Sequence, residues 1–154
     1  MSANFFVDTN VLIYLLAGRE PAPGETLTRD ELASNIKADA ALNLLGGEAM
    51  FLSVQVFNEI CNVVLRRRFN WKNAMELLSA LESLCVEVLP ITLDTHKRGL
   101  LLREKYKMQF FDALMVASAL QAGCEIFYSE DMQHGQLIEG SLRIQNPFAR
   151  DGQA

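Results

Sequence analysis

Short apolar runs alternate with stretches of helical periodicity along the chain. Four runs have the length and apolar character of short buried strands, and they lie at residues 4–8, 49–53, 86–91 and 124–129. A fifth, weaker strand is predicted at residues 142–145, where Asn146 and Pro147 end it.

Helical patterns fill the stretches between these runs. Thr28 and Glu31 form a capping-box pattern at the start of a helix that runs to about Leu45 and ends at two glycines. The other predicted helices cover residues 10–17, 54–68 (with Ser53 as its cap), 71–84, a stretch from Thr92 or Asp94 to about 106, and 111–122, closed by Gly123.

Strands that alternate with helices predict an α/β fold, with a mainly parallel sheet covered by helices on both faces. At 154 residues, with 50% hydrophobic and 21% charged side chains, the chain has the composition of one ordinary globular domain. We expect that domain to cover residues 1–148, with an exposed loop at 18–28 and a disordered tail at 149–154.

Several classes of protein are disfavoured by composition. No apolar run approaches the roughly 20 residues needed to cross a bilayer, and no basic region followed by an apolar stretch opens the chain. We therefore expect a cytoplasmic protein. Three widely spaced cysteines and two histidines indicate reduced thiols, and neither a disulfide framework nor a zinc site. The net charge of −5 neither supports nor excludes a nucleic-acid partner, because four of the acids form the candidate site below.

Four carboxylates are predicted to meet at one edge of the sheet. In a parallel sheet, the carboxyl ends of the strands and the N-termini of the following helices share the edge where ligands bind. Asp8 and Asp131 follow strands, and Asp112 lies in the first turn of a helix. Glu59 lies about 9 Å down its helix at 1.5 Å per residue, but its long side chain leans back toward that edge.

Such a cluster needs cations, because closely spaced carboxylates repel one another. Hard oxygen ligands suit Mg²⁺, with Mn²⁺ as a substitute. The chemistry that uses this arrangement is phosphodiester hydrolysis by a metal-activated water. Each acid also has an ordinary interpretation: Asp8 as a helix cap, Asp112 as a partner of the helix dipole, Asp131 as a turn residue, and Glu59 as part of a solvated polar stripe. Arg66 shares that stripe and is the candidate phosphate contact.

At these residues the chain resembles the PIN-domain ribonucleases, and especially the VapC-type toxins of bacterial toxin–antitoxin pairs. The matching segments are Phe6-Val7-Asp8-Thr9-Asn10-Val11-Leu12, Ser53-Val54-Gln55-Val56-Phe57-Asn58-Glu59, Phe111-Asp112-Ala113-Leu114 and Ser129-Glu130-Asp131-Met132-Gln133-His134-Gly135. The resemblance covers residues 4 to 148. The 18–28 stretch looks longer than compact members of the family need.

The resemblance implies a three-layer α/β/α sandwich that cleaves RNA with Mg²⁺. It also implies a homodimer and an antitoxin that inserts a segment near the site. By motif match, Asp8, Glu59, Asp112 and Asp131 would be the catalytic and metal-binding residues. Ser129 would support Asp131 by a hydrogen bond, and Asn10 and Asn62 would lie behind the metal-binding acids and orient them.

Three other functions remain to be weighed against this one. A catalytically weak PIN-like module would bind RNA or a protein partner without cutting, although the complete set of four acids argues against it. A phosphatase with Asp8 as its nucleophile would need an acid where Asn10 stands. A phosphoacceptor receiver domain would need a lysine near a late strand end, and residues 124–129 and the residues after them offer none.

Overall fold

The computed structural model describes residues 3–47 and 49–149, and a six-stranded sheet forms its centre. The strands are β1 (Phe5–Val7), β2 (Met50–Ser53), β3 (Glu87–Leu89), β4 (Ile126–Tyr128), β5 (Leu137–Ile138) and β6 (Leu142–Gln145), in the order β3-β2-β1-β4-β6-β5. All neighbouring pairs are parallel except β5 with β6. The predicted parallel sheet is confirmed, and the two-residue β5 is an addition to it.

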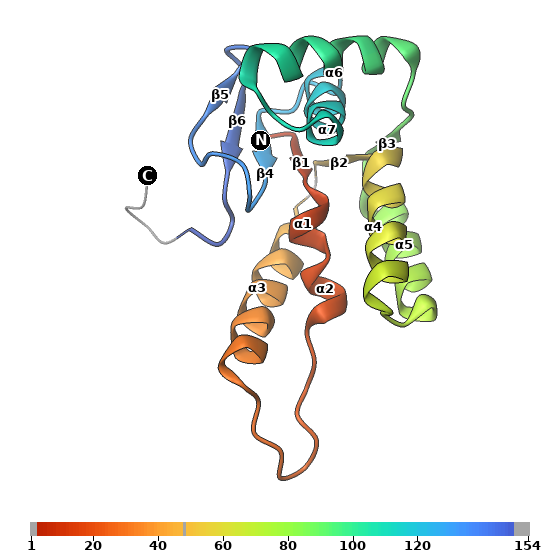
Figure 1. Cartoon of the computed structure of the whole chain (residues 1–154), viewed down its shortest axis with the longest axis vertical. Coiled ribbons are helices and arrows are strands. Elements are labelled where there is room, and N and C mark those ends of the chain that lie inside the picture. The colour runs from red at the N-terminus through yellow and green to blue at the C-terminus, as the bar shows by residue number, and fades with distance from the viewer. Residues whose placement is uncertain (1–2, 48, 150–154) are drawn as a thin grey trace.

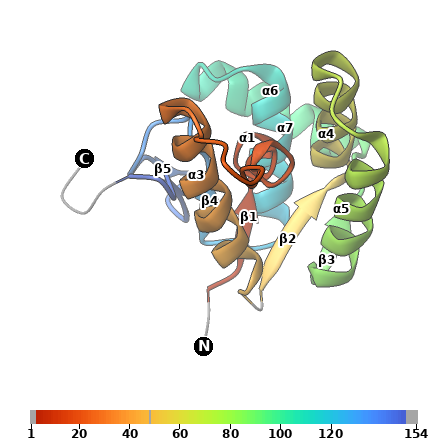
Figure 2. The same cartoon turned by 90° about the horizontal axis from the view of Figure 1, so that it is seen from below.

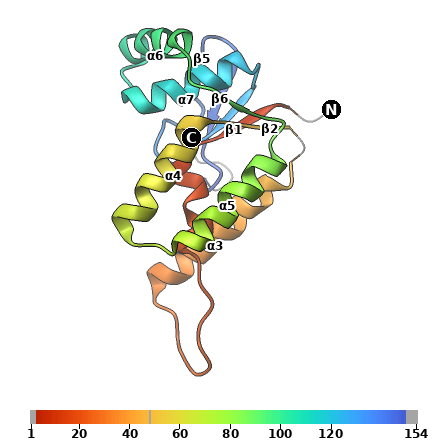
Figure 3. The ribbon, with the colours of Figure 1, turned by 90° about the vertical axis from the view of Figure 1, so that its right-hand side faces the viewer.

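Helices cover both faces of this sheet, so the predicted three-layer α/β/α fold is also confirmed. They are α1 (Thr9–Leu12), α2 (Tyr14–Ala17), α3 (Arg29–Leu45), α4 (Val54–Arg67), α5 (Trp71–Leu84), α6 (Leu93–Tyr106) and α7 (Phe110–Gln121). Figures 1 and 3 show α6 and α7 on one face, and α1 to α5 on the other. Seen from below, α1 and α3 lie in front of the central strands (Figure 2).

The helix ends follow local sequence signals closely. Thr28 accepts a hydrogen bond from the Glu31 backbone, and the Glu31 side chain accepts one from the Thr28 backbone, so the predicted capping box is present. Ser53 occupies the cap position of α4, but its side chain makes no capping bond, and its buried Oγ has no hydrogen-bond partner among the described residues. The predicted cap position of Ser53 is therefore confirmed, although its side chain does not make the capping bond.

The predicted helix at residues 10–17 forms as two short helices. The helix α1 ends at Ile13 and α2 begins after it, while Ile13 keeps helical dihedrals and donates its N–H to the Thr9 carbonyl. The interruption is a change of hydrogen bonding at one residue, and the two segments keep nearly one direction in Figure 1. Because neither glycine nor proline marks this point, the residue pattern contains no signal for it.

The core is densest where α7 packs between α6 and β2. Residues 113–119 of α7 are all buried, as its nearly continuous apolar sequence predicts. After α7, Gly123 adopts a positive φ of 71°, which a glycine reaches without steric cost. This burial fixes the orientation of the first turn of α7, which carries Asp112.

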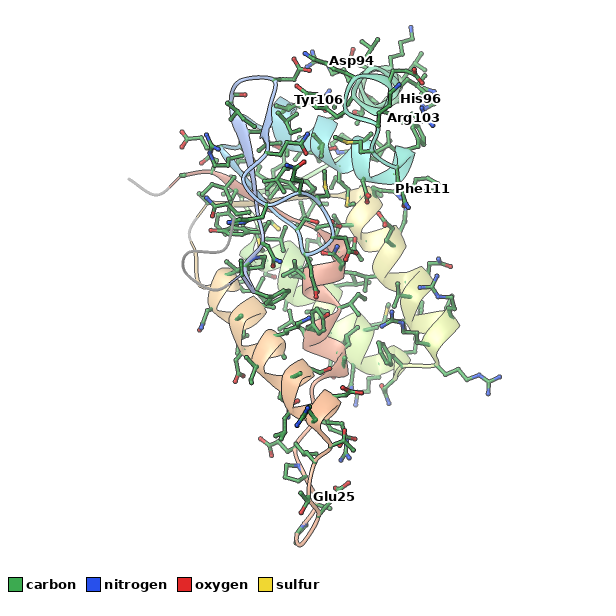
Figure 4. The ribbon with its side chains drawn as sticks, turned by 60° about the vertical axis from the view of Figure 1, so that its left-hand side comes forward. Glu25, Asp94, His96, Arg103, Tyr106 and Phe111 are labelled. Atoms are coloured by element: carbon green, nitrogen blue, oxygen red, sulfur yellow. The ribbon has the colours of Figure 1, made fainter. Side chains whose placement is uncertain are left out.

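The 18–28 loop is exposed, as predicted, and extends beyond the body of the molecule in Figure 1. Glu25 lies near its tip, at the opposite end of the molecule from Asp94 and Phe111 (Figure 4). Arg19 forms salt bridges with Glu25 and Glu31, which tie the base of the loop to the start of α3.

Three remaining expectations concern composition and the tail. Cys61, Cys85 and Cys124 are free thiols, although only Cys124 is fully buried. Of the expected disordered tail at residues 149–154, Ala149 is described and donates its N–H to the Asn146 carbonyl, and residues 150–154 lie outside the described residues. Within the described ranges, no helix combines the length and apolar character needed to cross a membrane.

Candidate active site

A cleft of about 850 Å³ opens at the carboxyl edge of the central strands. The segment after β1, the helix α4, the start of α7 and the segment after β4 all contribute to its walls. All four predicted acids are among its lining residues: Asp8, Glu59, Asp112 and Asp131. The structure therefore brings together side chains that are up to 123 positions apart in the sequence, between Asp8 and Asp131.

Asp8 lies at the floor of this cleft, directly after β1, and is only 3% exposed. Ser129 donates a hydrogen bond from Oγ to Asp8 Oδ2 at 2.8 Å. Burial raises the pKa of Asp8 to about 7, and the nearby charges of Asp112 and Glu59 act in the same direction against the Ser129 hydrogen bond. Above pH 7 this carboxyl group is mostly deprotonated, so protons compete little with a cation for its oxygens.

Asp112 and Glu59 form the half-buried middle of the acidic cluster. Burial raises the pKa of Asp112, and the charge of Asp131 raises it further. Burial also raises the pKa of Glu59, where the charge of Asp112 adds to the effect and a hydrogen bond from Gln55 Nε2 at 3.3 Å opposes it. These mutual effects indicate that the carboxylates lie close enough to interact electrostatically.

Asp131 lies at the exposed rim of the cleft, and Asn10 orients it. The Asn10 Nδ2 atom donates to Asp131 Oδ2 at 2.9 Å, while Asn10 Oδ1 accepts a hydrogen bond from the Glu130 backbone at 3.4 Å. Ser129 Oγ also accepts from the Met132 N–H at 3.3 Å. Asn10 therefore contacts a predicted acid directly, whereas Ser129 bonds to Asp8 and not to Asp131, the acid that it was predicted to support.

Asn62 is not brought to the cleft, because it is exposed and is not among the residues that line it. The α4 residues that do line the cleft are Glu59, Val63, Arg66 and Arg67. Their spacing of four, seven and eight residues places them on one face of the helix. This face is rotated slightly about the helix axis from the polar stripe that contains Glu59 and Arg66. It therefore includes Val63 and Arg67 and leaves Asn62 out.

Further lining residues were not predicted as part of the site. They come from α2, from the turn between α6 and α7, and from the segment after β4, and they include Tyr14, Lys107, Gln109, Glu130 and Gln136. Glu130 is adjacent to Asp131 in sequence, which is the one signal that could have identified it. For Tyr14, Lys107 and Gln109, only the packing of α2 against α3 and of α6 against α7 brings them to the cleft.

The donor set suits a divalent cation by its chemistry. It consists of carboxylate oxygens, which Mg²⁺ and Mn²⁺ prefer, and the mutual repulsion of the acids would be relieved by a bound cation. No group of three or more His, Cys, Asp or Glu side chains in the described part of the chain is close enough to form a complete metal cage. The residues thus fit a hard cation in type and charge, without forming a preorganised coordination sphere.

The sheet order and the helical layers place the chain in the α/β/α class, with an acidic cleft at the carboxyl edge of its sheet, and the PIN domain family matches residues 5–137. The chain belongs to the PIN domain family. No curated protein matches it in sequence.

Solved structures share the fold at low sequence identity. A toxin–antitoxin complex from Klebsiella pneumoniae aligns with a TM-score of 0.62 and 21% identity, over 96% of this chain and 98% of the other. VapC20 from Mycobacterium tuberculosis, a toxin that cleaves the sarcin–ricin loop, aligns with a TM-score of 0.55 and 19% identity, over 80% and 87%. VapBC2 from Rickettsia felis, bound to a DNA fragment from its promoter, aligns with a TM-score of 0.61 and 13% identity. The alignment covers 92% of this chain and 97% of the other.

Proposed function

We propose that the chain is a Mg²⁺-dependent endoribonuclease that acts in the cytoplasm as the toxin of a toxin–antitoxin pair. The observation that carries this proposal is the convergence of Asp8, Glu59, Asp112 and Asp131 on one cleft, with Asp8 buried at its floor. Membership of the PIN domain family and the fold shared with VapC20 support the same assignment.

The four acids would hold the cation. When bound, it would lower the pKa of a water molecule for attack on the scissile phosphate and stabilise the departing oxygen. Ser129 holds one oxygen of Asp8 and thereby fixes the orientation of that carboxylate. Asn10 does the same for Asp131 through its amide group. Both contacts reduce the reorganisation that ligand binding requires.

RNA would enter along the wall formed by α4 and the turn after α6. Arg66 and Arg67 line the cleft from α4, and Lys107 lines it from the C-terminal end of α6. Positive side chains at the edge of an acidic cleft contact backbone phosphates and guide the scissile bond toward the cation. The antitoxin and the homodimer of this proposal rest on the family resemblance and on the complexes among the structural neighbours.

A cleavage assay tests this proposal. The wild type, incubated with a structured RNA and with DNA of the same sequence, should cut the RNA in the presence of Mg²⁺ and stop when EDTA is added. Asp8→Asn should lower the cleavage rate by about 100-fold or more, because it removes the central carboxylate. Asp39→Asn is the matched control, since Asp39 is an exposed acid on α3 that does not line the cleft.

Two results would contradict the proposal. Cleavage that survives Asp8→Asn would place the chemistry elsewhere. RNA binding without cleavage by the wild type, with either Mg²⁺ or Mn²⁺, would favour the catalytically weak binding module.

A further inference from the structure

Two consecutive acids follow β4, and the structure gives them different partners. Asp131 receives its hydrogen bond from Asn10. Glu130, which also lines the cleft, forms an ion pair with Lys37 from the middle of α3. Lys37 and Glu130 are 93 positions apart in sequence, so this contact exists only in the folded chain.

Lys37 is held firmly at this position. Its Nζ lies 3.3 Å from the Tyr14 hydroxyl, 5.1 Å from the centre of the Tyr14 ring and 5.4 Å from that of Phe148. The two rings pack edge to face, with their centres 5.4 Å apart. The ammonium group therefore lies against two aromatic rings, and 32% of the Lys37 side chain is exposed. A cation in such a setting is a stronger partner than one on an open surface.

The segment that Lys37 holds is the segment that presents Asp131. The Glu130 backbone donates to Asn10, and Asn10 donates in turn to Asp131. The Met132 backbone donates to Ser129, and Ser129 donates to Asp8. Loss of the Lys37 ion pair would release the Glu130 side chain and loosen both chains of hydrogen bonds. It would also leave a fifth negative charge free at the wall of the cleft.

We propose that Lys37 is a positioning residue for the acidic cleft: by pairing with Glu130 it keeps this carboxylate away from the four acids and holds residues 129–132 so that Asp131 faces the cleft. The inference rests on the proposed function for its effect on catalysis. The contacts that carry it are present in the protein without any ligand, so the positioning itself can be tested separately.

Lys37→Met removes the charge and keeps most of the length of the side chain. We expect cleavage to fall about tenfold or more, because misplacement of one carboxylate disturbs the reacting geometry. At the same time, Mn²⁺ affinity measured by calorimetry should fall about tenfold, because Asp131, one of the proposed ligands, is no longer held facing the cleft. Both losses should occur without a change in the far-ultraviolet circular dichroism spectrum, which a general loss of structure would alter.

A second substitution separates charge pairing from simple packing. Glu130→Gln alone should change cleavage by less than about threefold, because the amide oxygen still accepts from Lys37. Lys37→Met combined with Glu130→Gln should stay about as slow as Lys37→Met, because the contact that holds residues 129–132 is absent in both, and Lys37→Arg should stay close to the wild type. If the double variant recovers most of the lost cleavage, Lys37 acts only by neutralising Glu130 and does not hold this segment, and the inference is wrong.

Lys105→Met is the matched control. Lys105 forms an ion pair with Glu139 at 3.2 Å and lies 5.4 Å from the centre of the Tyr106 ring, but it is not among the residues that line the cleft. Lys105→Met therefore also removes an ion pair and a contact between an ammonium group and an aromatic ring, but away from the cleft. Both Mn²⁺ affinity and cleavage should remain within about twofold of the wild type, the small change typical of an exposed pair.

Amide hydrogen exchange, measured without metal, tests whether Lys37 holds residues 129–132, and it does so whether or not the wild type cleaves RNA. Lys37→Met should speed exchange of the Glu130 and Met132 amides about tenfold or more, and Lys105→Met should not. Unchanged exchange in Lys37→Met would overturn the inference. A wild type that cuts no RNA, combined with faster exchange in Lys37→Met, would overturn the proposed function and leave the positioning role supported.

Discussion

Ser129 and Asp8 are 121 positions apart in sequence, yet the Ser129 Oγ lies 2.8 Å from Asp8 Oδ2 and donates a hydrogen bond to it. Both side chains are buried, so the bond forms away from water. It joins the end of β1 to the end of the neighbouring strand β4, and it stabilises the charged form of the acid at the floor of the cleft.

Ser129→Ala should therefore raise the pKa of Asp8 further, because the hydrogen bond that favours its charged form is lost. The pH midpoint of RNA cleavage should move upward. The free energy of unfolding should fall by about 1 kcal/mol, the usual cost of a lost buried hydrogen bond. Cleavage rates across a pH series and urea unfolding would measure the two effects. A midpoint that moves downward would contradict the role given to Ser129.

The stability of the metal-free protein should depend on pH through Asp8. Its pKa is raised from 3.8 to about 7 by folding, so between pH 4 and pH 7 the unfolded state loses this proton first. The contribution of Asp8 to stability is complete below pH 4 and is lost as the pH rises toward 7. Asp8→Asn should remove that loss, which amounts to a few kcal/mol at the upper end. Urea unfolding in EDTA at pH 5 and pH 8 gives the free energy of unfolding of both proteins at each pH. If this free energy changes with pH by the same amount in the wild type and in Asp8→Asn, the prediction is contradicted.

Millimolar Mg²⁺ should raise the melting temperature of the wild type, because the cation binds the folded state and relieves repulsion among the acids. Asp112→Asn should reduce this shift, since Asp112 interacts with both Asp8 and Asp131. Asp39→Asn should leave the shift unchanged. A melting temperature that does not respond to Mg²⁺ or Mn²⁺ would argue against a metal site in the cleft.

Arg66→Gln should weaken RNA binding and raise KM more than it lowers kcat, because Arg66 lies on the wall of the cleft and not at its acidic floor. The slope of log affinity against log salt should become shallower by about one unit for each lost phosphate contact. Arg68→Gln is the matched control, since Arg68 follows on the same helix end but does not line the cleft. Equal effects of the two substitutions would mean that only overall charge matters.

The shared edge of Asp8, Asp112 and Asp131 could be predicted from the sequence because parallel topology requires it. Once strands alternate with helices, residues at strand ends and helix starts must meet. The choice between Asn62 and Val63 on α4 could not be predicted in the same way. It depends on the rotation of the helix about its axis, which packing against β2 and α7 sets.

Contacts between distant segments were the least predictable part. No sequence pattern around Lys37 or Glu130 indicates its partner, and the pair forms only because the fold brings the middle of α3 to the residues after β4. The two-residue β5 was missed for a similar reason. Its pairing with β6 comes from the chain reversing after Leu137–Ile138, and no apolar run marks it.

The central claim is that the acids of this cleft hold a divalent cation, and a crystal structure of the protein soaked with Mn²⁺ tests it most directly. Anomalous scattering should place a Mn²⁺ ion at bonding distance, about 2.2 Å, from carboxylate oxygens of Asp8 and Asp112. A crystal that binds Mn²⁺ only elsewhere, or that shows no anomalous peak in the cleft at millimolar Mn²⁺, would contradict the account.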